Sequence, residues 1–163
     1  MPLSSFQELL LPSHVLLDLE VTSKKRLFEQ IGLLFENHHP VSRSQVFDAL
    51  FQREKLGSTG LGLGFALPHG RMKGLKTTLC CFVRLHDPIP FEAPDNQGVR
   101  MACALLVPEH ANEQHLKLLG EIAEMFSDVS LRQALLTVSD SEEAWQLIQN
   151  GPSHARRQRS TTL

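Results

Sequence analysis

The chain has 163 residues, a length that fits one domain with a sizeable hydrophobic core. Apolar residues make up 42% of it and charged residues 21%, which are ordinary values for a globular protein and exclude wholesale disorder. The formal net charge of -2 argues against a nucleic-acid-binding protein that relies on a broad basic surface.

Hydropathy and cysteine usage both favour the cytoplasm. No apolar run approaches the length of a membrane span, and no basic region precedes the short apolar stretch at the N-terminus, so neither stable membrane insertion nor a secretory signal is expected. The chain has three cysteines, two of them adjacent, which suits a reducing compartment better than a disulfide framework.

The first third of the chain is predicted to form one strand and two helices. A short apolar run over residues 14–20 predicts the strand. Apolar residues recur at helical spacing over residues 23–38, which predicts an amphipathic helix. A second helix starts at the capping-box pattern of residues 42–45 and is expected to end near Glu54.

Strands and then helices follow a glycine-rich stretch. Three short apolar runs predict strands, and the last of them is nearly continuous and is therefore expected at the centre of the sheet. These runs cover residues 64–69, 76–85 and 99–108. Three helices complete the chain, over residues 112–126, 130–138 and 139–151. The first of them is expected to bury one face, made of Leu116, Leu119, Ile122 and Phe126.

This order of elements predicts an α/β fold, a single-domain sandwich of a mixed parallel and antiparallel sheet with helices on both faces. The domain is expected to span residues 1–150. Residues 151–163 carry three arginines and no acidic residue, so we expect a basic, disordered tail there.

The segment from Arg53 to Arg71, REKLGSTGLGLGFALPHGR, is unusually rich in glycine. It does not match the dinucleotide fingerprint, because its glycines follow a predicted helix and precede a strand. It lacks the lysine of a nucleotide-binding P-loop. It also lacks the Gly-x-Ser-x-Gly spacing of a serine hydrolase, since Ser58 directly follows Gly57.

His69, near the end of this segment, has two interpretations. One is a flexible hairpin that carries a histidine by chance. The other is a histidine presented to an anion, most simply a phosphate. Glycine is entropically costly, so a cluster of glycines indicates backbone that approaches something closely. The run GSTG offers N–H groups and hydroxyls suited to an anion, and Pro68 fixes the chain just before His69. These details favour the second interpretation.

Four stretches of the sequence resemble one known family. They are LGSTGLGLGFALPHGR, DPIPFEAPDNQGV, ALLVP and HLKLL. They are similar to the enzyme IIA domains of the mannitol/fructose type (type 2), the phosphoryl carriers of the bacterial phosphoenolpyruvate-dependent phosphotransferase system. The resemblance runs from about residue 5 to residue 150 and is strongest to the nitrogen-regulatory type.

The resemblance implies an active centre of three residues. It makes His69 the phosphorylated histidine, modified on Nε2 by an HPr-like phosphocarrier protein. His115 matches the second active-centre histidine, and Arg53 matches the arginine that contacts the phosphoryl group. General chemistry agrees, because phosphoryl transfer needs positioning and charge neutralisation, which an arginine and a helix N-terminus can supply. On its residues alone, His115 could equally be an ordinary position on a helix face.

Four more residues complete the predicted phosphate site: Ser58, Thr59, Gly60 and Arg71. Ser58 and Thr59 either donate hydrogen bonds to the phosphoryl group or to His69, or shape the turn. Arg71 either steers phosphate or an acidic partner, or is a solvated basic residue.

No cofactor and no metal are expected. His69, His110 and His115 lack the tight spacing of a zinc site. Cys80 and Cys81 are neighbours on a predicted strand, so their side chains point to opposite faces and cannot easily bind one metal together. With Cys103 they are expected to be small core residues.

Two functions within the family are open. A sugar-specific IIA protein, for fructose or mannitol, passes its phosphoryl group to a IIB domain during sugar uptake. The nitrogen-regulatory type controls partner proteins, such as transporters or kinases, through its phosphorylation state. The run from Phe91 to Gln97 resembles the nitrogen-regulatory subgroup. Two residues depart from it: Leu63 stands where asparagine is frequent, and Gly98 where proline is common.

A binding module that has kept the fold but lost phosphoryl transfer is a third possibility. The presence of Arg53, His69 and His115 together argues against it.

Overall fold

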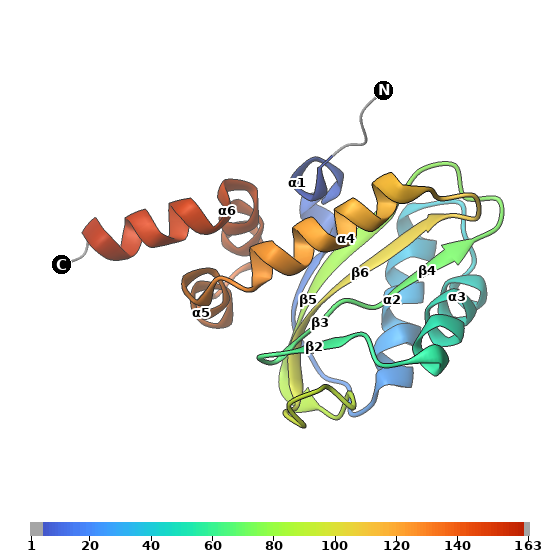
Figure 1. Cartoon of the computed structure of the whole chain (residues 1–163), viewed down its shortest axis with the longest axis horizontal. Coiled ribbons are helices and arrows are strands. Elements are labelled where there is room, and N and C mark those ends of the chain that lie inside the picture. Colours follow the sequence, from blue (N-terminus) through green and yellow to red (C-terminus); the bar gives the residue numbers. More distant parts are fainter. Residues whose placement is uncertain (1–4, 162–163) are drawn as a thin grey trace.

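A computed structural model describes residues 5–161 of the chain; for Gln114 and residues 152–161 it covers the backbone alone (Figure 1). The elements before the glycine-rich stretch are α1 (Phe6–Leu9), the 3-10 helix η1 (Pro12–His14), β1 (Val15–Leu19), α2 (Lys24–His38) and α3 (Arg43–Leu56). The strands that follow are β2 (Gly60–Gly62), β3 (Phe65–Ala66), β4 (His69–Met72), β5 (Leu79–Ile89) and β6 (Val99–Pro108). The last helices are α4 (Glu113–Phe126), α5 (Val129–Thr137) and α6 (Ser141–Thr161).

The strands form one mixed sheet with β6 at its centre. Within the described residues it has six strands in the order β1-β5-β6-β3-β2, and β4 also pairs with β6. β5 and β6 are antiparallel, whereas β3 and β4 run parallel to β6 and β1 runs parallel to β5. The mixed sheet and the central position of residues 99–108 are as predicted.

Helices cover both faces of the sheet, which confirms the predicted sandwich (Figure 1). One core packs the sheet against α1, α4, α5 and α6, and the other packs it against α2 and α3. Side chains alternate between the two cores along each central strand, as the period of a strand requires. Cys80 and Cys103 belong to the first core and Cys81 to the second, so the adjacent cysteines do point to opposite faces.

Side-chain caps explain where several helices begin. Ser23, Ser42 and Asp128 each precede a helix, and each accepts a hydrogen bond from the backbone N–H three residues further on. Such a cap pairs one of the amide groups that the first turn leaves without an intrahelical partner. The predicted start of the second helix at residues 42–45 is therefore confirmed.

The predicted apolar face of α4 is partly wrong. The buried residues of this helix are Leu118, Ile122, Met125 and Phe126, whereas Leu116 is 62% exposed. The true stripe follows the i, i+4, i+7 spacing from Leu118, which also fits an amphipathic helix. Leu116 faces away from the core, toward the pocket described below.

The glycine-rich stretch forms a hairpin, as one of its two interpretations had it, but the strand that begins this hairpin was not predicted. Residues 60–62 form β2, which pairs antiparallel with β3, and positive φ angles occur at Gly62, the last residue of β2, and at Leu63 and Gly64, which connect the two strands. The predicted strand over residues 64–69 is split at Pro68, which lacks an N–H and separates β3 from β4.

The loop between β5 and β6 holds this hairpin in place. Asp95 accepts a hydrogen bond from the backbone N–H of Leu63 at 2.9 Å. Nearby, a Cβ at residue 98 would lie 2.8 Å from the Cβ of Pro88, so glycine at this position accommodates that proline. Packing against Pro88 thus explains why this chain has glycine at position 98, where proline is common in the nitrogen-regulatory subgroup.

The last helix is broken at Gly151, where the sequence placed its end. Gly151 has φ 74° and ψ -174°, and helical backbone continues beyond it to Thr161 (Figure 1). The division of the chain at residue 150 into a domain and a disordered tail stays a prediction. No helix in the described part of the chain is long and apolar enough to cross a membrane.

Candidate active site

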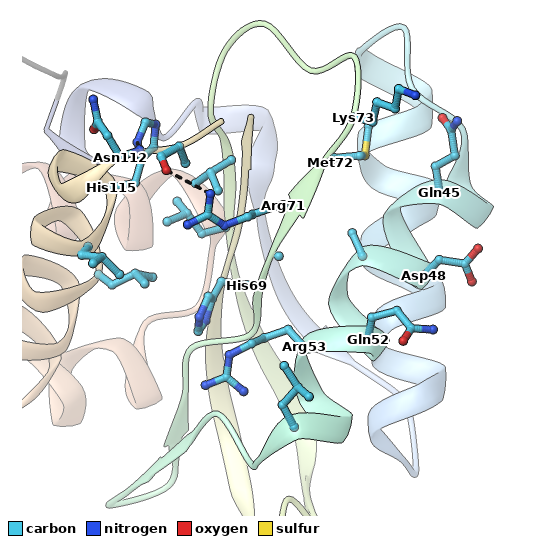
Figure 2. Close-up of a pocket in the computed structure, with 18 residues that line it drawn as sticks. Gln45, Asp48, Gln52, Arg53, His69, Arg71, Met72, Lys73, Asn112 and His115 are labelled. Carbon is cyan, nitrogen blue, oxygen red and sulfur yellow. Dashed lines mark hydrogen bonds between the residues drawn. The ribbon is translucent and has the colours of Figure 1, made fainter. Parts of the chain in front are cut away.

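His69 is the first residue of β4 and lies beside the end of α3. β4 runs parallel to β6 with His69 opposite Leu105. The next residue must be glycine, because a Cβ at Gly70 would lie 2.5 Å from the carbonyl oxygen of Ala49. This close contact brings the last turn of α3, with Arg53, next to His69 (Figure 2).

A backbone carbonyl sets the orientation of the His69 ring. Nδ1 lies 2.9 Å from the carbonyl oxygen of Leu67. Since a carbonyl oxygen only accepts, Nδ1 must carry the proton, and in the neutral ring Nε2 then holds a lone pair. Burial lowers the pKa of His69 and the nearby Arg53 lowers it further, while the bond to Leu67 and the charge of Glu54 oppose the shift. The neutral, nucleophilic form is therefore favoured at neutral pH.

A pocket of about 730 Å³ opens in front of His69, between α3, β4 and the start of α4 (Figure 2). Its polar lining includes Gln52, Arg53, His69, Arg71, Asn112 and His115. The structure thus brings together the four predicted site residues that carry imidazole or guanidinium groups. Leu116 and Leu119 line its apolar side.

Arg53 is held at the end of α3 by the loop that follows. Its Nη1 donates to the carbonyl oxygen of Gly57 at 2.8 Å. This bond fixes a planar cation beside His69, a group suited to bind phosphate oxygens.

His115 lies in the first turn of α4. Its Nδ1 accepts a backbone hydrogen bond, whereas Nδ1 of His69 donates one. Its Nδ1 lies 3.2 Å from the backbone nitrogen of Asn112, whose N–H donates to it. His115 thereby occupies the place of Glu or Gln in a capping box. Nδ1 is the acceptor, so the proton of the neutral ring is on Nε2. The pocket therefore holds one imidazole with an acceptor Nε2 and one with a donor Nε2.

Ser58, Thr59 and Gly60 do not line this pocket. The hydroxyl of Ser58 donates to the carbonyl oxygen of Phe91 and accepts from the N–H of Gly60. A Cβ at Gly60 would lie 3.0 Å from that of Ala93, so the hairpin packs tightly against the β5–β6 loop. These contacts agree with the interpretation in which the residues shape the turn.

Thr59 is bound to Glu54, a residue that sequence reasoning missed. Glu54 is only 7% exposed and accepts from the hydroxyl of Thr59 at 2.6 Å and from Lys24 of α2 at 2.8 Å. Glu54 follows Val46 and Leu50 at four-residue spacing on the buried face of α3. An acidic residue on an otherwise apolar stripe was the signal that could have revealed it.

The described residues contain no group of three or more His, Cys, Asp or Glu side chains placed to hold a metal ion. Burial raises the pKa of the Cys81 thiol to about 12, so this buried cysteine is a poor thiolate ligand.

Comparisons with known proteins agree with this fold. A family model described as phosphoenolpyruvate-dependent sugar phosphotransferase system, EIIA 2, matches residues 8–151. The nitrogen regulatory protein of Pseudomonas aeruginosa is 38% identical over 149 residues, which cover 89% of this chain and 97% of that protein.

Two solved structures superpose on most of the chain. The nitrogen regulatory protein IIA-Ntr from Neisseria meningitidis does so with a TM-score of 0.82 and 50% sequence identity, covering 86% of this chain and 97% of the other. The mannitol IIA structure from Escherichia coli has a TM-score of 0.71 and 21% identity, covering 83% and 95% of the two chains. The latter is a likeness of fold.

Fold and sequence together place this chain among proteins that carry phosphoryl groups. It belongs to the type-2 EIIA family of the phosphoenolpyruvate-dependent sugar phosphotransferase system.

Proposed function

We propose that this protein accepts a phosphoryl group on Nε2 of His69 from the phosphohistidine of an HPr-like phosphocarrier protein. The observation that carries the proposal is the bond between Nδ1 of His69 and the carbonyl oxygen of Leu67. It leaves the lone pair of Nε2 as the nucleophile, in a pocket that also holds Arg53 and His115.

The transfer requires no proton to move between the partners. The lone pair of Nε2 attacks the phosphorus, the P–N bond of the donor breaks, and its electron pair returns to the donor ring. That ring leaves as neutral imidazole when its other nitrogen is protonated. Phosphorylated His69 keeps its own proton on Nδ1, and this N–H continues to donate a hydrogen bond to the carbonyl oxygen of Leu67.

Arg53 and His115 stabilise the negative charge on the group in transit. In this proposal Arg53 binds the phosphoryl oxygens, and the Nε2–H of His115 donates to one of them. Ser58, Thr59 and Gly60 support the site through the hairpin. The hydroxyls of Ser58 and Thr59 donate to Phe91 and Glu54, and the N–H of Gly60 donates to Ser58.

The nitrogen-related branch of the phosphotransferase system fits the protein better than a sugar-specific role. The relatives that support this are the nitrogen regulatory proteins of Pseudomonas aeruginosa and Neisseria meningitidis, at 38% and 50% identity. The mannitol IIA structure shares 21%. The proposed output is control of cytoplasmic partner proteins, such as transporters or kinases, by the charge that the phosphoryl group adds.

The phosphoryl acceptor can be tested with a reconstituted system. Incubation with phosphoenolpyruvate, enzyme I and the HPr-like carrier should give an acid-labile adduct that is lost in His69→Ala. His110→Ala is the matched control, because His110 lies in the loop before α4 and should leave the adduct in place. An adduct that persists in His69→Ala would disprove the assignment.

The choice between the nitrogen-regulatory and the sugar-specific function can be tested by deleting the gene and measuring sugar uptake. A regulatory protein leaves fructose and mannitol uptake intact. A specific defect in either would favour the sugar-specific alternative, in which the phosphoryl group passes to a IIB domain.

A further inference from the structure

Arg71 reaches from β4 to the loop that leads into α4 (Figure 2). Its Nη1 donates to the carbonyl oxygens of Glu109 at 3.1 Å and of Ala111 at 2.9 Å. A charged donor that binds two carbonyls holds this loop more strongly than neutral hydrogen bonds would. The side chain therefore ties the edge of the sheet to the start of α4.

The carbonyl of Ala111 belongs to the same peptide group as the N–H of Asn112. Arg71 binds one end of this group, and the other end donates to Nδ1 of His115. A peptide group is planar, so fixing the direction of its C=O also fixes the direction of its N–H. A cation at the oxygen polarises the group and strengthens its N–H as a donor.

The hydrogen bond from Arg71 to the carbonyl of Ala111 and the one from the N–H of Asn112 to His115 form a relay. This relay determines which nitrogen of His115 carries the proton and faces the pocket as a donor. A proton on Nδ1 would point at the N–H of Asn112, so the relay holds the proton on Nε2. We propose that Arg71 is a positioning residue that acts through the Ala111–Asn112 peptide to hold His115 in its Nε2–H form, ready to donate to the phosphoryl group. The role in transfer rests on the proposed function; the effect on the ring of His115 does not.

The competing role for Arg71 is electrostatic, because a cation beside the pocket attracts any phosphate. Lys73 separates the two roles. It lies two residues further along the chain and lines the same pocket, so Lys73→Met removes the same charge from the pocket as Arg71→Met. Charge steering predicts similar effects from both variants, whereas positioning predicts an effect from Arg71→Met alone.

The first test is the ¹⁵N NMR spectrum of the histidine rings in the unphosphorylated protein. In the wild type and in Lys73→Met, His115 should show an unprotonated Nδ1 and a protonated Nε2. In Arg71→Met, the two nitrogen signals should move toward each other as the second tautomer becomes populated, while backbone spectra report that the fold is kept. Unchanged His115 signals in Arg71→Met would overturn the proposal.

The second test measures phosphorylation by phosphoramidate, a small donor that releases ammonia when its phosphoryl group passes to an imidazole nitrogen. It needs no docking of a partner protein. We expect Arg71→Met to slow phosphorylation of His69 by about tenfold, the low end of the effect that loss of a hydrogen-bond partner has at metal-bound histidines. In a His115→Gln background the same change should have no further effect, because Arg71 acts through His115.

Equal slowing by Arg71→Met in both backgrounds, or equal slowing by Lys73→Met, would contradict the relay. Failure of the wild type to accept phosphate would instead count against the proposed function, and the NMR comparison would still decide the role of Arg71.

Discussion

His69 and His115 differ in the backbone group that each ring contacts. His69 donates from Nδ1 to a carbonyl, whereas His115 accepts at Nδ1 from an amide. In the proposed mechanism the same side chain thus supplies a nucleophile at one position and a hydrogen-bond donor at the other. The tautomer of each ring is set by the main-chain group that it contacts, and for His115 we propose that Arg71 holds that group in place.

Leu63 is a residue whose conformation does not suit its type. It has φ 60° and is 63% exposed, so its side chain gains little from burial while its backbone occupies the left-handed region. Asparagine tolerates this region better than leucine does. We expect Leu63→Asn to raise the free energy of unfolding by about 0.5–1 kcal/mol, measured by urea denaturation.

Leu61 provides the matched control for this substitution. It is 46% exposed and lies in β2, outside the positive-φ turn. Leu61→Asn should give no stabilisation, since asparagine is disfavoured in strands. Equal stabilisation by both changes would show that the cause is loss of an exposed leucine, and not relief of the unfavourable left-handed backbone conformation at residue 63.

At the scale of elements, a cluster of histidines joins η1 to the end of α2. His14 is 2% exposed and contacts Nε2 of His39 at 2.8 Å through its own Nε2, while Ser13 contacts its Nδ1. Burial, together with the charges of His39 and His38, lowers the pKa of His14 to about 4. His14 therefore resists protonation in the folded protein.

The lowered pKa makes stability depend on pH in a defined window. His14 binds a proton near pH 6.5 in the unfolded chain and only near pH 4 in the folded chain. The full contribution of His14 to the free energy of unfolding is therefore present above about pH 6.5 and is lost as the pH falls toward 4. The loss amounts to about 3 kcal/mol at most, from 1.36 kcal/mol per pH unit. Denaturation at a series of pH values should show it in the wild type and show a smaller loss in His14→Asn.

His86→Asn is the control for this experiment. His86 is exposed and its pKa is raised by Asp87, so it does not contribute to a loss of this sign. The wild-type loss should persist in His86→Asn. An undiminished loss in His14→Asn would show that another group causes the acid sensitivity.

Two sequence motifs, the glycine-rich stretch and the segment DPIPFEAPDNQGV, pack against each other in the structure. Ser58 donates to the carbonyl of Phe91, Gly60 packs on Ala93, and Leu63 donates its N–H to Asp95. Each motif could be recognised in the sequence. Their contact with each other could not be predicted, because it depends on how the β5–β6 loop folds back over the hairpin, and no local sequence pattern indicates that.

At the scale of the molecule, the layers were predictable and the pocket was only partly so. Apolar periodicity and caps such as Ser42 located the main helices, and the continuous run over residues 99–108 indicated the central strand. Residue patterns alone indicated that His69 faces an anion, whereas its phosphorylation and the roles of Arg53 and His115 came from the resemblance to a family. The contacts of Arg71 and Glu54 join segments distant in the sequence, so only the folded chain reveals them.

In the proposed mechanism Nε2 of His69 carries the phosphoryl group while Nδ1 keeps its proton. The most direct measurement is NMR of protein labelled with ¹⁵N in its eight histidines and phosphorylated by the HPr-like carrier. We expect coupling of phosphorus to Nε2 of His69, with Nδ1 still protonated and donating to the carbonyl oxygen of Leu67. Coupling to Nδ1 of His69, or to a nitrogen of another histidine, would contradict this mechanism.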